Sequence, residues 1–585
     1  MTIDDITGNT FLPEPGVTVR GRTLIFAIDN RGYSSPELVL TDETGGERQR
    51  IRLQVHPLLP ALSTAVVEPE KTPFEAYYYE DRGRRFPDPH TEQIRGGLCF
   101  LRTTAPVVPV SGKRPVLDDM MIYKLHIKGF TAAAPGRDPD RGTFRGLVSR
   151  LSYIRELGFN TIEMMPLYAF DDRLGDGRRN YWGYAVRNCY LAPQDAYAAS
   201  DDPAAELHSL ITAIHQEGMA CLTEICFPAG TPAAEAVRVA RFWHERYDID
   251  GFRFLGAGVP ERALREDIRL SRAVLLFEQA DRADLGRTEA GMPRRIGLEN
   301  GAFRHCLRAF LKGTPGSAGA ALAAMTNDGG TAVTICDMAN VNGMTLYDAV
   351  SYDRKHNEIN GEHNADGPDN DNSWNCGVEG PTRNSTVLAL RKRLIKNALA
   401  FVLLSPGVPL LYAGDERGNS QNGCNNAYAS DDPVGWVSWR RTALSAELTA
   451  FTKRLTAVRR SLDLPGLIRD RSGKLAGGMP RLSIHGREAW YRSGDDETPA
   501  FALMYAVDEE SWFYAAFNSS PEPFDFALPI PPEGMAWQRL LSTDEASCPE
   551  TGEAAPDLTD QRRFRAAPRC VTILTIGRRK EESCH

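Results

Sequence analysis

The chain has 585 residues and a formal net charge of -9. This length exceeds the size at which one hydrophobic core stops growing, so we expect two or three domains. Hydrophobic residues make up 42% and charged residues 25%, which is ordinary for a soluble globular protein. The acidic balance offers no basic field, and we therefore expect neither nucleic acid nor a membrane as a partner.

The first residues, MTIDDITGNTFLPEPG, are acidic and polar, whereas a secretory signal is basic and then apolar. No later stretch reaches the apolar length of a membrane span. We therefore expect a cytoplasmic protein. The 11 cysteines are odd in number and scattered, without a CxxC pair or a Cys/His cluster. This pattern predicts neither a disulfide framework nor a zinc site, and we expect no metal and no cofactor.

The first part of the chain shows short alternating runs broken by Gly, Pro and Asn, for example Thr23 to Ile28, Glu37 to Leu40 and Gln49 to Val55. Runs of this kind are typical of a β-sandwich. The Pro-rich passage from Pro106 to Pro115 indicates a linker. We predict an N-terminal β-sandwich over residues 1–105, similar to a carbohydrate-binding module.

From Met121 onward, short apolar runs alternate with amphipathic helices, which predicts βα units around a parallel sheet. About 350 residues of this pattern suit an eight-stranded barrel with insertions. We therefore predict an α/β fold in which a (β/α)8 TIM barrel over residues 106–465 is flanked by two β-sandwiches. The runs that mark its strands are Met121 to Ile127, Thr161 to Met165, Ala220 to Phe227, Gly251 to Leu255, Val274 to Phe277, Thr331 to Cys336 and Val408 to Tyr412.

After Pro465 short strands return, for example Ala500 to Tyr505, Trp512 to Phe517 and Cys570 to Ile576. These runs again have the length and composition of sandwich strands. A C-terminal β-sandwich over residues 466–585 completes the predicted organisation.

The barrel region also carries recognisable motifs. They are MIYKLHIKGFT at 121–131, NYWGY at 180–184, GFRF at 251–254, TLYDAVSYDRKHNEINGEHN at 345–364, DNSWNCGVEGPT at 371–382, GVPLLYAGDERG at 407–418 and NNAYASDD at 425–432. In order and spacing they resemble the alpha-amylase superfamily, specifically its isoamylase and glycogen-debranching branch. The resemblance covers nearly the whole barrel and implies that catalytic groups, where present, lie at the C-terminal ends of the strands.

Retaining cleavage of a glycosidic bond needs a carboxylate nucleophile and a carboxylic acid about 5 Å apart, and the family adds a third carboxylate. The family nucleophile is an Asp two residues after the Arg of GFR, and here that position is Leu255. A leucine has no group that can attack an anomeric carbon. Arg253, which orients the nucleophile in the family, is retained. The neighbouring acids Asp250, Glu261 and Glu266 lie before the strand or in the following helix and are no obvious substitute.

Two further catalytic positions resemble those of the family. AVLLFEQAD places Glu278 on the general acid, although a lone Glu at a strand end is often only a salt-bridge partner. Direct alignment of TAVTICD puts Cys336 on the family His and Asp337 on its transition-state Asp. Alignment backwards from GMTLYD gives Val341 and Asn342 instead. We favour the first because an insertion after a strand costs less than shifting a buried strand.

The third strand carries TEICFPAG, with Glu224, Pro228 and Ala229 where the family has Asp, Asn and His. Roughly 20 residues then separate Pro228 from Asp250, which is barely a loop and one helix. The long excursion by which family enzymes wall the active cleft is therefore missing.

Several aromatic and amide side chains lie in loops that resemble the substrate-lining loops of the family, and they suit stacking on sugars and hydrogen bonding to hydroxyls. They are Tyr181, Trp182, Tyr184, Trp374, Asn375 and Asn426. The alternative is that they only pack the barrel mouth. The acidic stretch from His356 to Asp371 could hold a metal, but its resemblance to a family loop favours a hydrogen-bonded, capped loop.

Three functions remain open at this point. The first is a catalytically inactive homologue that binds an α-glucan, glycogen or starch-like, or that regulates an active debranching paralogue, as an inactive type of plant isoamylase does. The second is an active α-1,6-glucan debranching hydrolase with Glu278 as acid and an altered nucleophile. The third is a purely protein-interaction scaffold. Loss of a nucleophile typically costs several orders of magnitude in rate, so the sequence favours the first.

Overall fold

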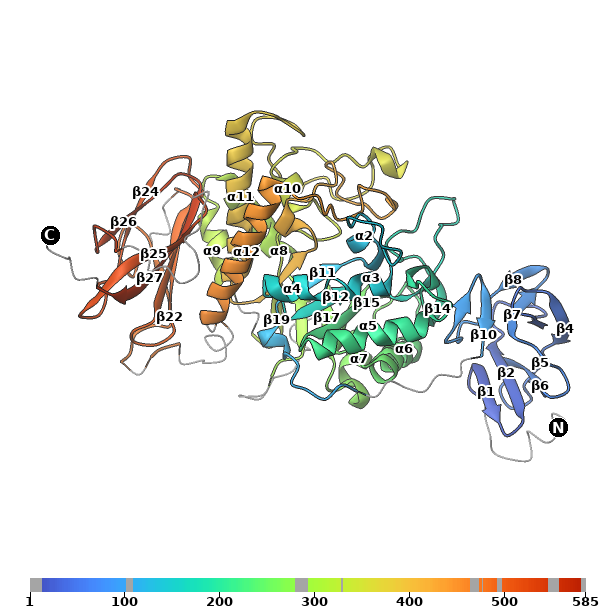
Figure 1. The fold of residues 1–585 in the computed structure, drawn as a ribbon. Helices are drawn as coiled ribbons and strands as arrows, with labels where there is room; N and C mark the ends of the chain where they lie inside the picture. The colour runs from blue at the N-terminus through green and yellow to red at the C-terminus, as the bar shows by residue number, and fades with distance from the viewer. Residues whose placement is uncertain are drawn as a thin grey trace.

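The computed structural model describes residues 13–101, 109–278, 293–327, 330–462, 464, 473–475, 477–491, 497–544 and 557–579. Three bodies follow one another in space, a group of N-terminal strands, a central barrel surrounded by helices and a group of C-terminal strands (Figure 1). The predicted (β/α)8 barrel between two sets of antiparallel sheets is confirmed. Among the residues just given, no helix is long and apolar enough to cross a membrane.

The N-terminal region consists of two antiparallel sheets. The first has the order β1 (Gly16–Arg20), β2 (Thr23–Asp29), β6 (Leu62–Val67) and β5 (Gln54–Val55). The second has the order β4 (Glu47–Arg52), β3 (Glu37–Thr41), β7 (Ala76–Asp81), β10 (Leu98–Phe100) and β9 (Ile94–Arg95), and β8 (Arg84–Phe86) pairs with β7. Alternate residues of the facing strands, such as Phe26 and Tyr79, form the shared core.

One strand prediction in this region was wrong. The run from Gln49 to Val55 is not a single strand, because β4 and β5 belong to different sheets. The chain changes sheets at Leu53, whose side chain is buried in the core and whose N–H donates to the carbonyl of Pro36. A short run of alternating residues does not reveal such a crossing.

The central barrel has eight parallel strands, and the last pairs with the first to close it. In order they are β11 (Ile122–Leu125), β12 (Thr161–Met164), β15 (Ala220–Cys226), β16 (Gly251–Leu255), β17 (Val274–Phe277), β18 (Ile296–Glu299), β19 (Val333–Cys336) and β20 (Val408–Tyr412). Seven of them match the runs taken from the sequence. The missed strand is β18, a four-residue IGLE whose Gly297 leaves room for the side chains of Leu276 and Ile335.

The barrel interior is layered. Its lower layer is apolar and includes Ile122, Leu222, Leu276, Ile335 and Leu410. Side chains two residues further along a strand point to the same side of the sheet. The next layer toward the C-terminal ends of the strands therefore contains charged side chains, namely Lys124 on β11, Glu224 on β15 and Arg253 on β16. The apolar floor therefore supports a polar mouth.

Helices cover the outside of the barrel (Figure 1). The longer ones are α4 (Leu151–Leu157), α5 (Pro203–Gln216), α6 (Ala233–Tyr247), α8 (Gly301–Lys312), α9 (Ala318–Thr326), α11 (Ser385–Leu404) and α12 (Ala443–Ser461). The shorter ones are α2 (Ile127–Thr131), α3 (Phe144–Val148), α7 (Glu261–Glu266) and α10 (Leu346–Ala349). Side-chain caps fix several starts, including Asp202 before α5 and a capping box at Thr442 before α12.

An antiparallel pair, β13 (Tyr168–Phe170) and β14 (Val186–Pro193), extends the barrel toward the N-terminal sheets. At the other end, a five-stranded sheet has the order β21 (Leu482–His485), β22 (Ala500–Ala506), β23 (Trp512–Asn518), β27 (Cys570–Arg578) and β25 (Met535–Ser542). A second pair is formed by β24 (Phe524–Ala527) and β26 (Arg563–Ala566).

The C-terminal sheets pack on the barrel helices. The rings of Phe310 and Phe501 lie 5.0 Å apart, and those of Phe401 and Phe517 lie 5.7 Å apart. The hydrophobic core is therefore continuous from the barrel into the C-terminal sandwich. The predicted domain boundaries near 105 and 465 stay a prediction, because residues 102–108 and 465–472 lie outside the described part of the chain.

Candidate functional site at the barrel mouth

Four charged side chains fill the interior above the apolar layer. Lys124 on β11, Glu163 on β12, Glu224 on β15 and Arg253 on β16 are each at most 1% exposed. Lys124 Nζ lies 2.5 Å from Glu224 Oε1 and 3.5 Å from Glu163 Oε1. Arg253 binds both oxygens of Glu163, with Nε at 2.7 Å and Nη2 at 2.8 Å. Two cations thus neutralise two buried carboxylates.

The two carboxylates differ in their acidity. Burial raises the pKa of Glu163, but the charges of Arg253 and Lys124 outweigh burial and hold that pKa below its usual value. Burial also raises the pKa of Glu224, and the neighbouring Glu163 adds to the rise against the opposing Lys124. The hydroxyl of Tyr184 donates to Glu224 at 2.6 Å. Ion pairs thus balance these charges within the barrel.

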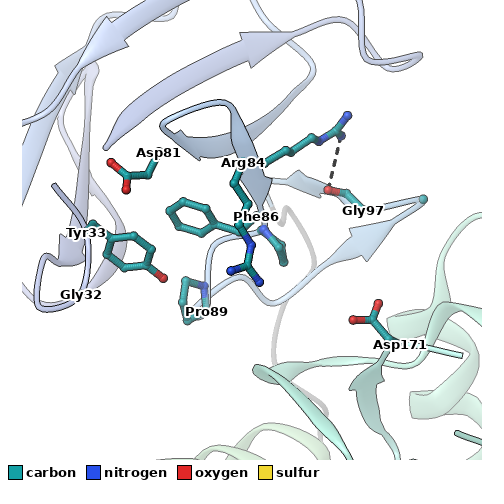
Figure 2. Close-up of a pocket in the computed structure, with 11 residues that line it drawn as sticks. Gly32, Tyr33, Asp81, Arg84, Phe86, Pro89, Gly97 and Asp171 are labelled. Carbon is teal, nitrogen blue, oxygen red and sulfur yellow. Dashed lines mark hydrogen bonds between the residues drawn. The ribbon is translucent and has the colours of Figure 1, made fainter. Parts of the chain in front are cut away.

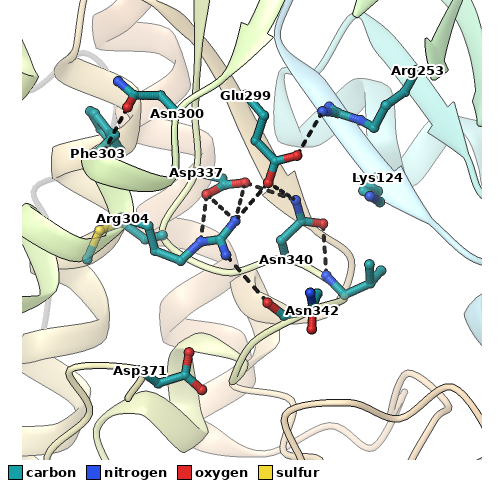
Figure 3. A network of polar contacts seen from close by, with 12 residues as sticks. Lys124, Arg253, Glu299, Asn300, Phe303, Arg304, Asp337, Asn340, Asn342 and Asp371 are labelled. Carbon is teal, nitrogen blue, oxygen red and sulfur yellow. Dashed lines mark hydrogen bonds and ion pairs between the residues drawn. The ribbon is translucent and has the colours of Figure 1, made fainter. Parts of the chain in front are cut away.

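A second group of charges lies around β18 and β19 (Figure 3). Asp337 directly follows β19 and is 2% exposed. Arg304 of α8 binds both of its oxygens, with Nε to Oδ1 at 2.9 Å and Nη2 to Oδ2 at 2.8 Å. Asn340 Nδ2 adds a third donor at 3.0 Å. Burial raises the pKa of Asp337, and Arg304 opposes that rise.

Glu299, the last residue of β18, joins the two groups. Its Oε2 lies 3.6 Å from Arg253 Nη1, and its Oε1 lies 3.4 Å from Arg304 Nη2. Figure 3 shows Glu299 between the two arginines. One continuous network of ion pairs therefore runs through the barrel mouth from Lys124 to Asp337.

The end of the fourth strand contributes no acid to this network. Leu255 is the last residue of β16 and is half-buried. It stands two residues after Arg253, so its side chain points to the same side, toward the barrel interior. An aliphatic group occupies the position that the family resemblance assigns to the nucleophile.

Glu278 follows β17 and is exposed. Its Oε2 accepts from the backbone N–H of Gly256 at 3.4 Å, which places it beside the loop that follows Leu255. Asp337 adjoins the end of β19, whereas Asn342 lies five residues further on, and this favours the direct alignment of the seventh strand. Burial raises the pKa of the Cys336 thiol to about 12, so Cys336 is no nucleophile at neutral pH.

The predicted sugar-binding aromatics pack closely at the mouth. Tyr181 and Trp182 are each 6% exposed and belong to one apolar cluster, against which Tyr184 packs. The Tyr181 hydroxyl donates to the carbonyl of Gly435, and its ring lies 4.0 Å from that of His126. These contacts match the packing alternative for the NYWGY segment.

The other predicted binding residues have partners elsewhere. The guanidinium of Arg569, from the C-terminal sandwich, lies 4.8 Å above the Trp374 ring. The amide of Asn375 donates to Glu379 at 3.1 Å, and that of Asn426 donates to Asp366 at 2.9 Å. Trp374 and Asn375 thus contact different partners from the NYWGY aromatics.

The stretch from His356 to Asp371 is closed by side-chain hydrogen bonds. Asn357 and Asn425 exchange two of them, at 2.8 and 2.9 Å, and Asn360 donates to Asp366 at 2.8 Å. In the described residues, no group of three or more His, Cys, Asp or Glu side chains is suited to hold a metal ion. The carboxylate of Asp366 therefore stabilises the loop by accepting a hydrogen bond within it.

The loops after the third and fourth strands are bonded backbone to backbone. The N–H of Phe227 donates to the carbonyl of Leu255, and the N–H of Gly258 donates to the carbonyl of Phe227, each at 2.9 Å. A Cβ at Gly258 would stand 1.9 Å from the carbonyl oxygen of Pro228. This close approach is possible because glycine has no Cβ.

Sequence reasoning missed four members of the network: Lys124, Glu163, Glu299 and Arg304. Lys124 and Glu163 carried a signal, since a charged residue within an apolar strand must find a buried partner. Glu299 was missed together with β18. Arg304 comes from a helix, and its partner Asp337 is 33 positions away.

No protein-family model matches the chain. The chain is 28% identical to the glycogen operon protein GlgX homologue of Mycobacterium tuberculosis over 523 residues, 73% of this chain and 72% of that protein. It is 28% identical to the glycogen debranching enzyme of Klebsiella pneumoniae (75% and 79% of the two chains). It is 27% identical to the chloroplastic isoamylase 1 of rice (73% and 64%).

Solved structures show the same fold. The catalytic module of the glycogen-degrading pneumococcal virulence factor SpuA superposes with a TM-score of 0.73 at 15% identity, over 98% of this chain and 99% of that chain. The type I pullulanase of Bacillus subtilis, complexed with maltose, gives 0.70 at 16% identity over 97% and 85%.

The closed barrel and its flanking sheets thus have the fold of these glucan-degrading enzymes. The names of the sequence relatives are consistent with the isoamylase and glycogen-debranching branch of the alpha-amylase superfamily, to which the motifs also pointed.

Proposed function

We propose that this protein is a catalytically inactive member of the debranching branch that binds α-glucan. One observation carries the proposal: Leu255 stands where the family nucleophile would stand, at the end of β16. Retaining hydrolysis requires a carboxylate at that point, and a single acid such as Glu278 does not complete the reaction. The barrel therefore keeps its scaffold without the group that forms the covalent intermediate.

A second, independent feature supports inactivity. The family resemblance assigns transition-state stabilisation to Asp337, and Arg304 engages both of its oxygens. Removing one partner of such a buried pair costs about 3–5 kcal/mol. A sugar would have to displace Arg304 to reach this carboxylate.

The names of relatives and neighbours support an α-glucan as ligand, either glycogen or a starch-like chain. Curated relatives are named as glycogen debranching enzyme and isoamylase, and one structural neighbour holds maltose. As a finer part of the proposal, the protein acts as a regulatory or targeting subunit of an active debranching enzyme.

The test is isothermal titration of the purified chain with maltoheptaose and glycogen, with reducing-sugar release followed for hours in the same samples. Glu278→Gln is the matched control, because it removes the remaining acid and leaves the fold. We expect binding without release. Release above that control contradicts inactivity and favours the active hydrolase, whereas the absence of both leaves a protein-interaction scaffold.

The variant Leu255→Asp separates the missing nucleophile from the engagement of Asp337 by Arg304. We expect no reducing-sugar release from this variant, because Arg304 still holds Asp337. Release at a rate typical of debranching enzymes would show that the nucleophile is the one missing part.

The regulatory role is tested by titrating an active debranching enzyme of the same organism with this chain. A shared elution volume and a changed rate are expected, and an unchanged rate contradicts regulation.

A further inference from the structure

A groove runs between the N-terminal sheets and the barrel, away from the barrel mouth. It consists of two hollows, of about 750 and 580 Å³, that share Tyr33 and Pro89 as lining residues. The first is also lined by Arg84, Phe86 and Asp171 (Figure 2). The second extends over Tyr190 to residues 228–232, the short turn that follows β15. Hollows of this size between domains are common places for small ligands.

The two walls of the groove are fixed to each other. Ile94 of the N-terminal sheets is buried against Ala169, Cys189 and Ala192 of the β13–β14 pair. The N–H of Gly96 donates to Asp195 at 3.2 Å. Arg246 of α6 lies 3.5 Å from Glu92. Because these contacts cross the junction, a ligand would meet a preformed site and lose little free energy to ordering it.

The turn that forms the barrel wall is itself held in shape. Both the N–H and the hydroxyl of Thr231 donate to the carbonyl of Pro228, at 3.2 and 2.7 Å. The helix α6 then begins at Ala233. Family enzymes have a long excursion at this place, so the second hollow lies where this chain is short.

Tyr33 provides an aromatic surface at the centre of the groove. Its ring stacks on that of Phe86, with centroids 4.5 Å apart and an interplanar angle of 8°. Figure 2 shows the two rings side by side, with the Tyr33 hydroxyl directed toward Pro89. A half-buried ring supported in this way presents a flat, rigid apolar surface at little entropic cost.

Two basic side chains, Arg84 and His90, lie near this ring. Arg84 is exposed, and in the described part of the chain its guanidinium makes no hydrogen bond or ion pair. Nδ1 of His90 is buried without a hydrogen-bond partner among the same residues, and it lies 3.7 Å from Asp88 Oδ1. His90 therefore faces Asp88, whereas the exposed guanidinium of Arg84 is suited to donate to the hydroxyls of a ligand.

The charge balance indicates what kind of ligand fits. The first hollow is lined by two positively charged residues, Arg84 and Arg85, and by two negatively charged residues, Asp81 and Asp171. An anion such as a phosphate would meet both aspartates, and a cation would meet both arginines. A neutral molecule with many hydroxyls can use donors and acceptors together while one of its faces stacks on Tyr33.

We propose that this groove binds a linear α-glucan segment as a second site, separate from the barrel mouth. The inference rests on the proposed function, because it takes α-glucan as the ligand and adds where it binds. Tyr33 stacks on a glucose ring, and Arg84 donates to its hydroxyls.

The test is isothermal titration of the full chain with maltoheptaose, comparing wild type, Tyr33→Leu, Tyr33→Phe and Arg84→Ala. Leucine keeps bulk but removes the flat ring, so we expect Kd to rise about tenfold, as for loss of a central anchor. Phenylalanine keeps the ring, and Kd should stay within about threefold because one hydroxyl is lost. For Arg84→Ala we expect a rise of about fivefold.

Arg22→Ala is the matched control, since Arg22 is an exposed arginine of the same sheets that pairs with Glu70 and does not line the groove. Its Kd should equal that of wild type. If wild type binds and both Tyr33→Leu and Arg84→Ala bind equally well, the groove is excluded and the proposed function stands. If wild type binds no glucan, both proposals fall. Should Tyr33→Leu unfold, Arg84→Ala decides, because that side chain is exposed.

Discussion

The barrel mouth and the junction groove use charged side chains in opposite ways. At the mouth, Arg253 binds Glu163 and Arg304 binds Asp337, each at hydrogen-bonding distance. In the groove, Arg84 makes no such contact within the described residues. Groups that satisfy each other stabilise the protein but are unavailable to a ligand, whereas unsatisfied groups gain a partner when a ligand arrives. The charges of the mouth therefore stabilise the barrel, whereas the groove has a charged group that is available to a ligand.

The largest effect is expected from Arg253→Met, which breaks the centre of the mouth network. Glu163 and Glu299 would keep their charges without Arg253, and breaking a buried pair costs about 3–5 kcal/mol. Thermal unfolding measures the loss. The control is Arg262→Ala, which removes an exposed pair with Glu266 and should leave the midpoint unchanged. Equal midpoints for both variants would show that the network contributes no stability.

Acid should weaken the mouth through His126. Burial lowers the pKa of His126 to about 4. An unfolded histidine gains its proton near pH 6.5, whereas His126 in the folded protein gains its proton only near pH 4. The contribution of neutral His126 to the free energy of unfolding is therefore complete above pH 6.5 and is lost as the pH falls toward 4. The loss amounts to about 3 kcal/mol over this window.

Unfolding midpoints of wild type and His126→Asn between pH 7.5 and 4.5 test this. The variant should be less stable at pH 7.5 but should depend less on pH. Exposed His305 offers a control, since His305→Asn should keep the slope of wild type. Parallel curves for wild type and His126→Asn would contradict the assignment.

Arg304→Leu tests the second half of the network. We expect a loss of about 3 kcal/mol at pH 8, at the lower end of the range for Arg253, because Arg304 is nearer to solvent. The pKa of Asp337, already raised by burial, should rise further. Protonation then removes the unpaired charge, so the difference from wild type should shrink as the pH falls. A constant difference across pH 5 to 8 would contradict this, and Arg304→Lys should recover part of the stability.

The smallest effect concerns the contact that joins mouth and groove. Gly258→Ala would place a methyl group 1.9 Å from the carbonyl oxygen of Pro228 and push the turn that lines the groove. We expect a loss of about 1 kcal/mol and weaker maltoheptaose binding. Gly175→Ala has no atom within 4 Å of its new methyl group and should behave as wild type. Unchanged binding by Gly258→Ala would separate the turn from the ligand site.

Much of the fold could be predicted because it depends on local patterns. Seven barrel strands appeared as apolar runs separated by helical periodicity, and the family motifs fixed their order. The run at 49–55 and the strand β18 could not be assigned in this way. A change of sheet at Leu53 depends on a distant hydrogen bond to Pro36, and IGLE is too short to show a period.

The candidate site was predicted in part. A residue at a fixed distance from a motif is local information, so Leu255, Glu278 and Asp337 could be placed at their strand ends. Their partners could not. Tyr184 was expected to face a sugar, and in the structure its hydroxyl donates to Glu224.

The sequence by itself determined the resemblance to the isoamylase branch, the order of seven barrel strands and the absence of an acid at Leu255, because each follows from residues close together in the chain. The tertiary structure alone decided that Arg253 meets Glu163, 90 positions away, and that Arg304 covers Asp337. It also decided that Tyr33 lies opposite the turn after β15. The physical reason is barrel closure, since it sets which buried charges must neutralise one another and where the surfaces of two domains leave a groove.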